Sequence, residues 1–542
     1  MKNYDVVLRG GTVYDGSGGV PTAADVALHR DLIAAVGEPG TLPGTRVIDV
    51  TGLAVAPGFI NMMCWAVETL IEDGRSQSDI RQGVTLEVMG EGFSMGPLTD
   101  AMKESGVRGL LGTDDIKYDV TWTTLGEYLD HLVKRGVSCN IASFVGTSTL
   151  RINQMGYADR PPTPAELDGM KQLVRQAMEE GAVGLSSALI YPPASYAQTD
   201  ELIALARVAA EYDGIYISHL RSEGHRFYEA LDEFMTIIRE AKIRGEIYHL
   251  KAAGHANWHK MDEVIRRVEA AQAQGYAITA DMYNYTVSGT GLSACIPPWV
   301  HEGGTDALLN RLRDLNLREK IKADMNATTT EWENVWLAVE NADGIVLAGF
   351  KAEHLKPLTG KTLAQVAAER GQAPIDAAFD LLIEDGGRIF AMYHSMSEDN
   401  IRKQLALPWV SFCSDAESLA PEGVFLKSNP HPRAYGSFAR LLGRYVRDEK
   451  IIPLEAAVRR LAALPASVLK IKGRGLLRPG YYADVVVFDP AAVHDRATLD
   501  QPHQYAVGMQ HVFVNGTQVL ENGDHTGALP GRVVRGPGWT GA

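Results

Sequence analysis

Three features are scarce in this sequence, and each scarcity argues against a class of protein. Only four cysteines occur, at widely separated positions, and no two of them form a CxxC pair. A disulfide framework is therefore not expected, and a reducing compartment fits. Basic residues form no dense run and the net charge is −15, which argues against nucleic acid and membrane surfaces as partners. Neither a signal peptide nor an apolar run of membrane length is visible, so we expect a cytoplasmic protein.

What is present is typical of a large globular enzyme. The chain has 542 residues, of which 45% are apolar and 22% charged. These proportions are ordinary for a soluble protein, and the length predicts two or three domains.

Both ends of the chain have a β-rich pattern. Short strand-like runs at 4–8, 12–14, 24–28 and 32–36 are separated by glycine-rich turns, and similar runs recur at 483–488, 510–514 and 517–520. Asn515-Gly516 is a typical hairpin turn between the last two runs. We therefore expect residues 1–56 and 476–542 to form together one small β-sandwich.

The middle of the chain, residues 57–475, alternates strands and helices. Eight strand candidates lie at 54–60, 85–89, 139–144, 182–186, 215–219, 246–250, 277–281 and 409–414, with amphipathic helical stretches at 164–180, 199–212, 227–244 and 261–274. Regular alternation of this kind predicts a parallel sheet, and eight units indicate a closed (β/α)8 TIM-like barrel of the α/β class. The long segment at about 288–353, between the last two strands, is interpreted as an insertion at the barrel mouth.

Two histidines and one aspartate end predicted strands. These are His219, His249 and Asp415, and the carboxyl ends of barrel strands are where a barrel carries its chemistry. Imidazole is a common metal ligand, so the histidine pair predicts a metal site. Asp415 then suits a general acid/base beside a metal-activated water, although Ser414-Asp415 also has the pattern of a helix N-cap.

The sequence resembles the amidohydrolase superfamily, and within it the D-aminoacylases (N-acyl-D-amino-acid deacylases), over nearly its whole length. The resemblance lies in several segments together: AVAPGFI at 54–60, GTSTLR at 146–151, GLSSALIYP at 184–192, DMYNYT at 281–286, HPRAYGSF at 431–438 and GYYADVVVFDP at 480–490. It implies hydrolysis of a linear amide by a zinc-activated water.

By the same resemblance, particular residues receive roles. His219 and His249 would be zinc ligands and Asp415 the general acid/base. Tyr191, Lys251 and Arg433 would hold a substrate carboxylate, together with Tyr283 of the DMYNYT segment. An arginine fork, a lysine charge and tyrosine hydroxyls suit that purpose. The expected partner is thus a small molecule with a carboxylate, and the D preference is implied by the resemblance alone.

The chain also departs from the family at the metal ligands. The family's His-x-His at the end of strand one is replaced by Met63 and Trp65, and an indole cannot bind a metal. The family's bridging cysteine after strand two is missing, and Glu91 stands one position from it. We therefore expect one zinc ion, with Glu91 as the third ligand.

Several alternatives remain open from the sequence. Cys64 or Asp415 could be the third ligand, Glu91 could instead pair with Lys251 or Arg221, and Lys251 could be carbamylated. The barrel could cleave another amide, an ester or a cyclic amide, or could be a metal-free scaffold. Self-association into a homo-oligomer is also left open.

Overall fold

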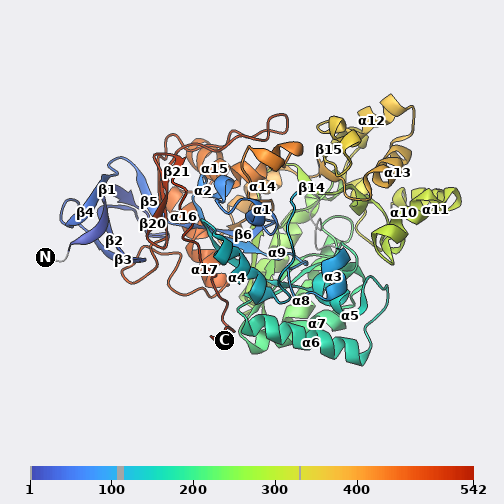
Figure 1. Ribbon diagram of the computed structural model, residues 1–542, viewed down its shortest axis with the longest axis horizontal. Helices are drawn as coiled ribbons and strands as arrows, with labels where there is room; N and C mark the ends of the chain where they lie inside the picture. The colour runs from blue at the N-terminus through green and yellow to red at the C-terminus, as the bar shows by residue number, and fades with distance from the viewer. Residues whose placement is uncertain (1–2, 106–114, 329–330, 542) are drawn as a thin grey trace.

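The computed structural model describes residues 3–105, 115–328 and 331–541. Three parts follow one another along the longest axis of the molecule (Figure 1). A β-sheet built from both chain ends lies at one end, a barrel lies in the middle, and an inserted α/β unit lies at the other end.

The terminal sheet joins the two ends of the chain. Nine strands run in the order β21-β20-β19-β18-β5-β1-β2-β3, with β4 paired to β1. Their bounds are β1 (Tyr4–Val13), β2 (Thr22–His29), β3 (Leu32–Gly37), β4 (Gly44–Asp49), β5 (Ala54–Pro57), β18 (Val485–Phe488), β19 (Met509–Val514), β20 (Thr517–Glu521) and β21 (Asp524–His525). The antiparallel pairing of β5 with β18 connects the N-terminal strands to the C-terminal ones.

This sheet differs in two ways from the expected β-sandwich. The runs at 4–8 and 12–14 are one strand, β1, interrupted by a register shift between Leu8 and Gly11. Leu32 on β3 also bridges Tyr482, just before β18. The nine strands are thus one continuous sheet that curls around a core including Val26 and Phe513. The expected Asn515-Gly516 turn is present, because both residues have positive φ, of 48° and 79°.

The barrel is closed by parallel strands from the middle of the chain. Its strands are β6 (Phe59–Cys64), β7 (Val84–Met89), β8 (Asn140–Ser143), β9 (Val145–Gly146), β10 (Gly184–Ala188), β11 (Ile215–His219), β12 (Arg244–Ile247), β13 (Ile278–Met282) and β17 (Val410–Phe412). Only Phe144 separates β8 from β9, so these two form one interrupted strand. Asp415 N donates to Met63 O at 3.1 Å, which brings the end of β17 against β6 and completes the ring.

The first barrel strand begins later than the sequence pattern predicted. The expected strand at 54–60 is split, because Ala54–Pro57 belongs to the terminal sheet and β6 starts at Phe59. Gly58 lies at the junction, where a Cβ atom would be 2.1 Å from Thr85 Oγ1. Only glycine fits this close approach of the chain to β7.

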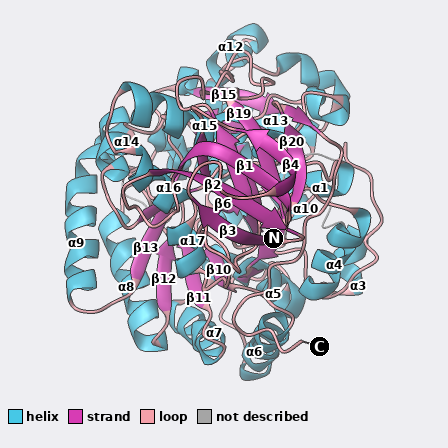
Figure 2. Cartoon of the chain, turned by 90° about the vertical axis from the view of Figure 1, so that its left-hand side faces the viewer, coloured by secondary structure: helices cyan, strands magenta, loops and turns pink. Residues whose placement is uncertain are grey.

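Helices cover the outside of the barrel, as Figure 2 shows for α6 to α9 around β10 to β13. The helices at 164–180, 199–212, 227–244 and 261–274 were predicted to within three residues at each end: the structure has α6 (Pro164–Glu179), α7 (Thr199–Glu211), α8 (Phe227–Ala241) and α9 (Met261–Ala273). The others are α1 (Thr69–Glu72), α2 (Gln77–Ile80), α3 (Asp100–Ser105), α4 (Leu125–Arg135), α5 (Thr147–Met155), α14 (Glu398–Leu405), α15 (Arg433–Arg440), α16 (Leu454–Leu461) and α17 (Ala463–Val468). None of the described helices combines the length and apolar content needed to span a bilayer.

The inserted unit lies between β13 and β17 and has its own apolar core. It contains an antiparallel sheet in the order β14-β16-β15. Its elements are β14 (Ser288–Gly291), α10 (Thr305–Arg313), α11 (Leu315–Met325), β15 (Ile345–Gly349), α12 (Leu363–Arg370), α13 (Pro374–Asp385) and β16 (Phe390–Tyr393). Its last strand ends at Tyr393, so the expected end near 353 covers only part of the unit.

Candidate metal centre and active site

Glu91, His219 and His249 meet at the carboxyl ends of β7, β11 and β12. One ligand atom from each lies within 4.8 Å of the other two. Glu91 Oε1 is 3.0 Å from His219 Nδ1 and 2.9 Å from His249 Nε2. All three side chains are buried. Among the described residues this is the only group of three or more His, Cys, Asp or Glu with such spacing.

The backbone around these residues is shaped to aim them inward. Gly90 and Gly92 have φ of 100° and 63°, so the chain turns sharply on both sides of Glu91. His249 itself has φ of 32°, and its N–H donates to Asp281 Oδ1 at 2.6 Å. A strained backbone held by a buried carboxylate is typical of a functional position.

The opposite sides of both imidazoles face a second carboxylate, Glu223. Its Oε2 lies 3.3 Å from His219 Nε2, and its Oε1 lies 3.1 Å from His249 Nδ1. Lys251 Nζ is 2.7 Å from the same Oε1 and also 2.7 Å from His249 Nδ1. Sequence reasoning gave Glu223 no role, although its position four residues after a candidate ligand was the available signal.

The charges of this cluster stabilise one another. Burial would raise the pKa of Glu91, but the nearby His249 and His219 outweigh it and hold that pKa below its usual value. Burial and Lys251 oppose protonation of His249, yet Glu223 and Glu91 raise the pKa of His249 to about 10. Without a metal, the imidazole therefore carries a proton that a metal must displace.

Asp415 follows β17, and its carboxylate has one hydrogen-bond donor and one ion-pair partner. Trp65 Nε1 donates to its Oδ1 at 3.2 Å, and Arg433 Nη1 lies 2.8 Å from its Oδ2. Both partners of this ion pair are buried. Asp415 has φ of 48°, outside the helical region, so its backbone does not continue into a helix.

The four predicted substrate-binding residues surround the same space, but three of them already have partners. Lys251 pairs with Glu223, and Arg433 pairs with Asp415. Tyr191 donates to or accepts from Thr290 of the inserted unit at 2.7 Å. Burial raises the pKa of both Tyr191 and Tyr283, so each hydroxyl stays neutral.

Three buried polar atoms of these four residues lack a hydrogen-bond partner among the described residues: Tyr283 Oη, Arg433 Nε and Arg433 Nη1, the last of which is in ion-pair contact with Asp415. The two side chains are adjacent, because Arg433 Cζ lies 4.5 Å from the centre of the Tyr283 ring. Buried donors without partners are rare in folded proteins, and a ligand is one explanation for them.

Several alternatives left open by the sequence lose support. Arg221 pairs with Glu233 at 2.7 Å and Lys251 with Glu223, so neither takes Glu91. Cys64 lies in the apolar core, and burial raises the pKa of its thiol well above the usual value. Asp415 is outside the group of ligand atoms formed by Glu91 and the histidines.

The donor set fits zinc. Two imidazole nitrogens and a carboxylate oxygen are the ligands that catalytic zinc sites use, and three of them leave a fourth position for water. The outer nitrogen of each histidine also has a carboxylate neighbour, which is the usual second layer around a metal-binding histidine.

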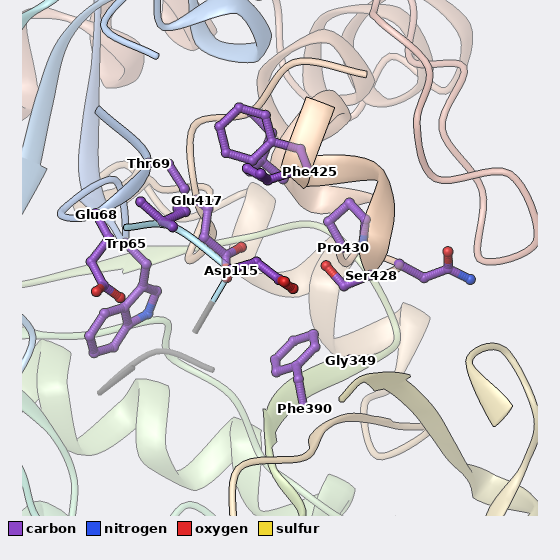
Figure 3. Close-up of a pocket in the computed structure, with 14 residues that line it drawn as sticks. Trp65, Glu68, Thr69, Asp115, Gly349, Phe390, Glu417, Phe425, Ser428 and Pro430 are labelled. Carbon is purple, nitrogen blue, oxygen red and sulfur yellow. The ribbon is translucent and has the colours of Figure 1, made fainter. Parts of the chain in front are cut away.

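A pocket is lined both by residues that follow barrel strands, such as Trp65 and Glu417, and by Gly349 and Phe390 of the inserted unit. Figure 3 shows Trp65, after β6, and Phe390, from β16, on two sides of this pocket. Phe425 and Pro430 contribute further apolar wall, and Glu417 contributes a carboxylate. Trp65 therefore touches both the pocket and the candidate acid/base.

Comparisons with known proteins agree on one family. A profile of the amidohydrolase family (Amidohydro_3) matches residues 46–520. The chain is 33% identical to a D-aminoacylase from Alcaligenes xylosoxydans xylosoxydans, over 98% of this chain and 97% of that protein.

Solved structures give the same result. An N-acyl-D-glutamate deacylase from Bordetella bronchiseptica, complexed with zinc and a phosphonate inhibitor that mimics the tetrahedral intermediate, aligns with a TM-score of 0.82 at 31% identity, over 98% of this chain and all of that one. A D-aminoacylase aligns with a TM-score of 0.81 at 32% identity, again over 98% of this chain and all of that one. That structure was determined for the role of a binuclear metal centre, with activation by one metal and attenuation by the second. The chain therefore belongs to the amidohydrolase family.

Proposed function

We propose that this protein hydrolyses the amide bond of N-acyl-D-amino acids and uses one zinc ion held by Glu91, His219 and His249. The observation that carries the proposal is the convergence of these three buried ligand atoms within 4.8 Å. Full-length relatives named D-aminoacylase and N-acyl-D-glutamate deacylase support the substrate class and its stereochemistry.

Zinc at this position would lower the pKa of water and polarise the amide carbonyl. Asp415 then accepts a proton from the attacking water and gives it to the leaving nitrogen. Its contacts with Trp65 Nε1 and Arg433 Nη1 hold the carboxylate in a fixed orientation.

The substrate carboxylate would bind near Arg433 and Tyr283, whose free buried donors can reach an anion. Tyr191 and Lys251 complete the polar side of the site. Lys251 can serve this purpose only by giving up part of its contact with His249 Nδ1, which a zinc-bound His249 would favour because that nitrogen then carries a proton.

The test is a screen of matched D- and L-forms of N-acetyl amino acids on zinc-loaded protein of known metal content. We expect hydrolysis of the D-forms, with the L-forms slower by at least about 100-fold. Inverting the configuration at the α-carbon removes a contact between the enzyme and the substrate's carboxylate or carbonyl, which is worth a few kcal/mol. Equal rates for both series would contradict the stereochemistry, and no turnover of either would contradict the function.

Metal removal gives a second prediction. Protein treated with a chelator should lose its amidase activity and regain it on addition of about one equivalent of zinc per chain. A further equivalent should have little effect, since Met63 and Trp65 replace the histidines that would hold a second ion. Activity that survives chelation at undetectable zinc would contradict the metal assignment.

Trp65 gives a third prediction, on substrate preference. Trp65→Ala removes an aromatic wall of the pocket, so the kcat/KM ratio between bulky and small N-acyl groups should change by about tenfold, the effect of about 1.4 kcal/mol of lost contact. Trp65→Phe keeps the wall but removes the N–H donated to Asp415, and should lower all rates with little change in the ratio. Trp539→Ala, at an exposed position, is the control. An unchanged ratio in Trp65→Ala would show that this pocket does not receive the acyl group.

We also propose that the protein acts in a reducing compartment such as the cytoplasm. All four cysteines are free and buried, which suits a protein that folds without disulfides. Assembly into a homo-oligomer stays a prediction.

A further inference from the structure

Glu223 occupies an unusual position relative to the two candidate zinc-binding histidines. It follows β11 in the loop that leads to α8 and is buried. Its two carboxylate oxygens reach different imidazoles, Oε2 toward His219 Nε2 at 3.3 Å and Oε1 toward His249 Nδ1 at 3.1 Å. One side chain thus lies against two ligands that come from neighbouring strands.

The nitrogens that Glu223 faces are the outer ones. Glu91 is within hydrogen-bond distance of His219 Nδ1 and His249 Nε2, the inner nitrogens. A metal among the three ligands must bind the inner nitrogens through their lone pairs. Each neutral imidazole then carries its single proton on the outer nitrogen, where an acceptor is needed.

The loop that carries Glu223 is fixed by contacts independent of the histidines. Glu223 O accepts a hydrogen bond from Ala253 N at 2.8 Å, which ties the loop after β11 to the loop after β12. In the same loop, the Arg221 guanidinium bonds to Glu233 and to the carbonyls of Ser195 and Ala197. The Glu223 carboxylate is therefore placed by the fold before any metal binds.

We propose that Glu223 is a positioning residue that sets the tautomers of both His219 and His249 and so prepares the inner nitrogens for zinc. The inference rests on the proposed zinc site. A carboxylate suits this purpose because it offers two acceptors, one for each outer N–H group. An amide offers one acceptor and one donor, and the donor would force one histidine to carry its proton on the inner nitrogen.

The test begins with Glu223→Gln, a change of almost no volume. We expect zinc affinity, measured by competition with a chromophoric chelator, to fall by about 10–100-fold, the usual effect of losing a carboxylate behind a metal-binding histidine. Glu229→Gln is the control, because Glu229 is an exposed glutamate in the first turn of α8 and its substitution leaves the Arg221–Glu233 anchor of the loop in place. It should retain the affinity of the unaltered protein. An affinity of Glu223→Gln within about twofold of the unaltered protein, against that expected range, would overturn the proposal.

A second measurement does not depend on the variant folding. Zinc-loaded unaltered protein with 15N-labelled histidine should show, by NMR, protons on Nε2 of His219 and Nδ1 of His249. Protons on the opposite nitrogens would overturn the proposal.

Adding formate to Glu223→Ala should restore part of the lost zinc affinity, and no restoration at a formate concentration that binds would also count against it. Failure of the unaltered protein to bind zinc would instead reject the proposed function, so the two failures are distinguishable.

Discussion

Replacing Asp415 by asparagine is expected to lower kcat/KM by about 1000-fold while the zinc content stays at one ion per chain. The proposed reaction uses this carboxylate twice, first to accept a proton from water and then to deliver it to the leaving nitrogen. Asparagine can still accept the hydrogen bond from Trp65 Nε1, so the geometry survives while the proton transfer does not.

The same substitution should also destabilise the fold. Arg433 is buried and pairs with Asp415, and loss of one partner of a buried ion pair costs about 3–5 kcal/mol. Activity must therefore be measured well below the melting temperature, on protein whose folded fraction is checked by circular dichroism. The control is Asp399→Asn, on the exposed surface of α14. It should match the unaltered protein in kcat/KM and in stability. Retention of more than a tenth of kcat/KM by Asp415→Asn would remove Asp415 from the mechanism, because general acid/base catalysis contributes about 100-fold or more.

Replacing Glu91 by glutamine is expected to weaken zinc binding by about 100-fold or more. Zinc sites with four protein ligands bind with about 10–16 kcal/mol, so one ligand contributes about 3 kcal/mol. The substitution also removes the negative charge of Glu91. The positive charge of the buried zinc ion then has only neutral imidazoles and a neutral amide beside it, which costs free energy. Activity should fall at stoichiometric zinc and recover in part when zinc is in large excess.

The matched comparison for Glu91 is Cys64→Ala. Both positions lie near the lost ligands of the family, but Cys64 packs in the apolar core and Glu91 faces the histidines. Metal analysis after dialysis against zinc-buffered solution should find one zinc per chain in Cys64→Ala and a clear deficit in Glu91→Gln. The reverse pattern would assign the third ligand to the thiol.

The residues at the positions of the two lost family histidines have other contacts in this protein. Where the strand-one histidines would stand, Met63 is buried and Trp65 donates to Asp415. Arg433 supplies a positive charge to the other oxygen of that carboxylate. An indole N–H from the end of β6 and a guanidinium from α15 thus contact the two carboxylate oxygens of Asp415.

Sequence periodicity predicted the barrel well because its signals are local. The helices at 164–179 and 199–211 have clear amphipathic patterns, and the first begins with a capping box between Thr163 and Glu166. Strand-end histidines were recognisable because parallel strands in a barrel present their carboxyl ends at one rim. The strand at the start of the barrel was misplaced, because 54–57 and 59–64 are both apolar and only pairing with β18 or β7 distinguishes them.

By itself, the sequence determined which residue types follow the barrel strands and the rim at which they lie, because residue type and strand position are properties of the chain; from these it predicted the metal ligands and the acid/base. Only the tertiary structure decided their partners. Glu223 reaches His249 and Lys251 from the loop after β11, and Arg433 reaches Asp415 from the start of α15. The reason is physical: the charge state and orientation of a buried group depend on neighbours within a few ångströms, and folding brings those neighbours from distant parts of the chain.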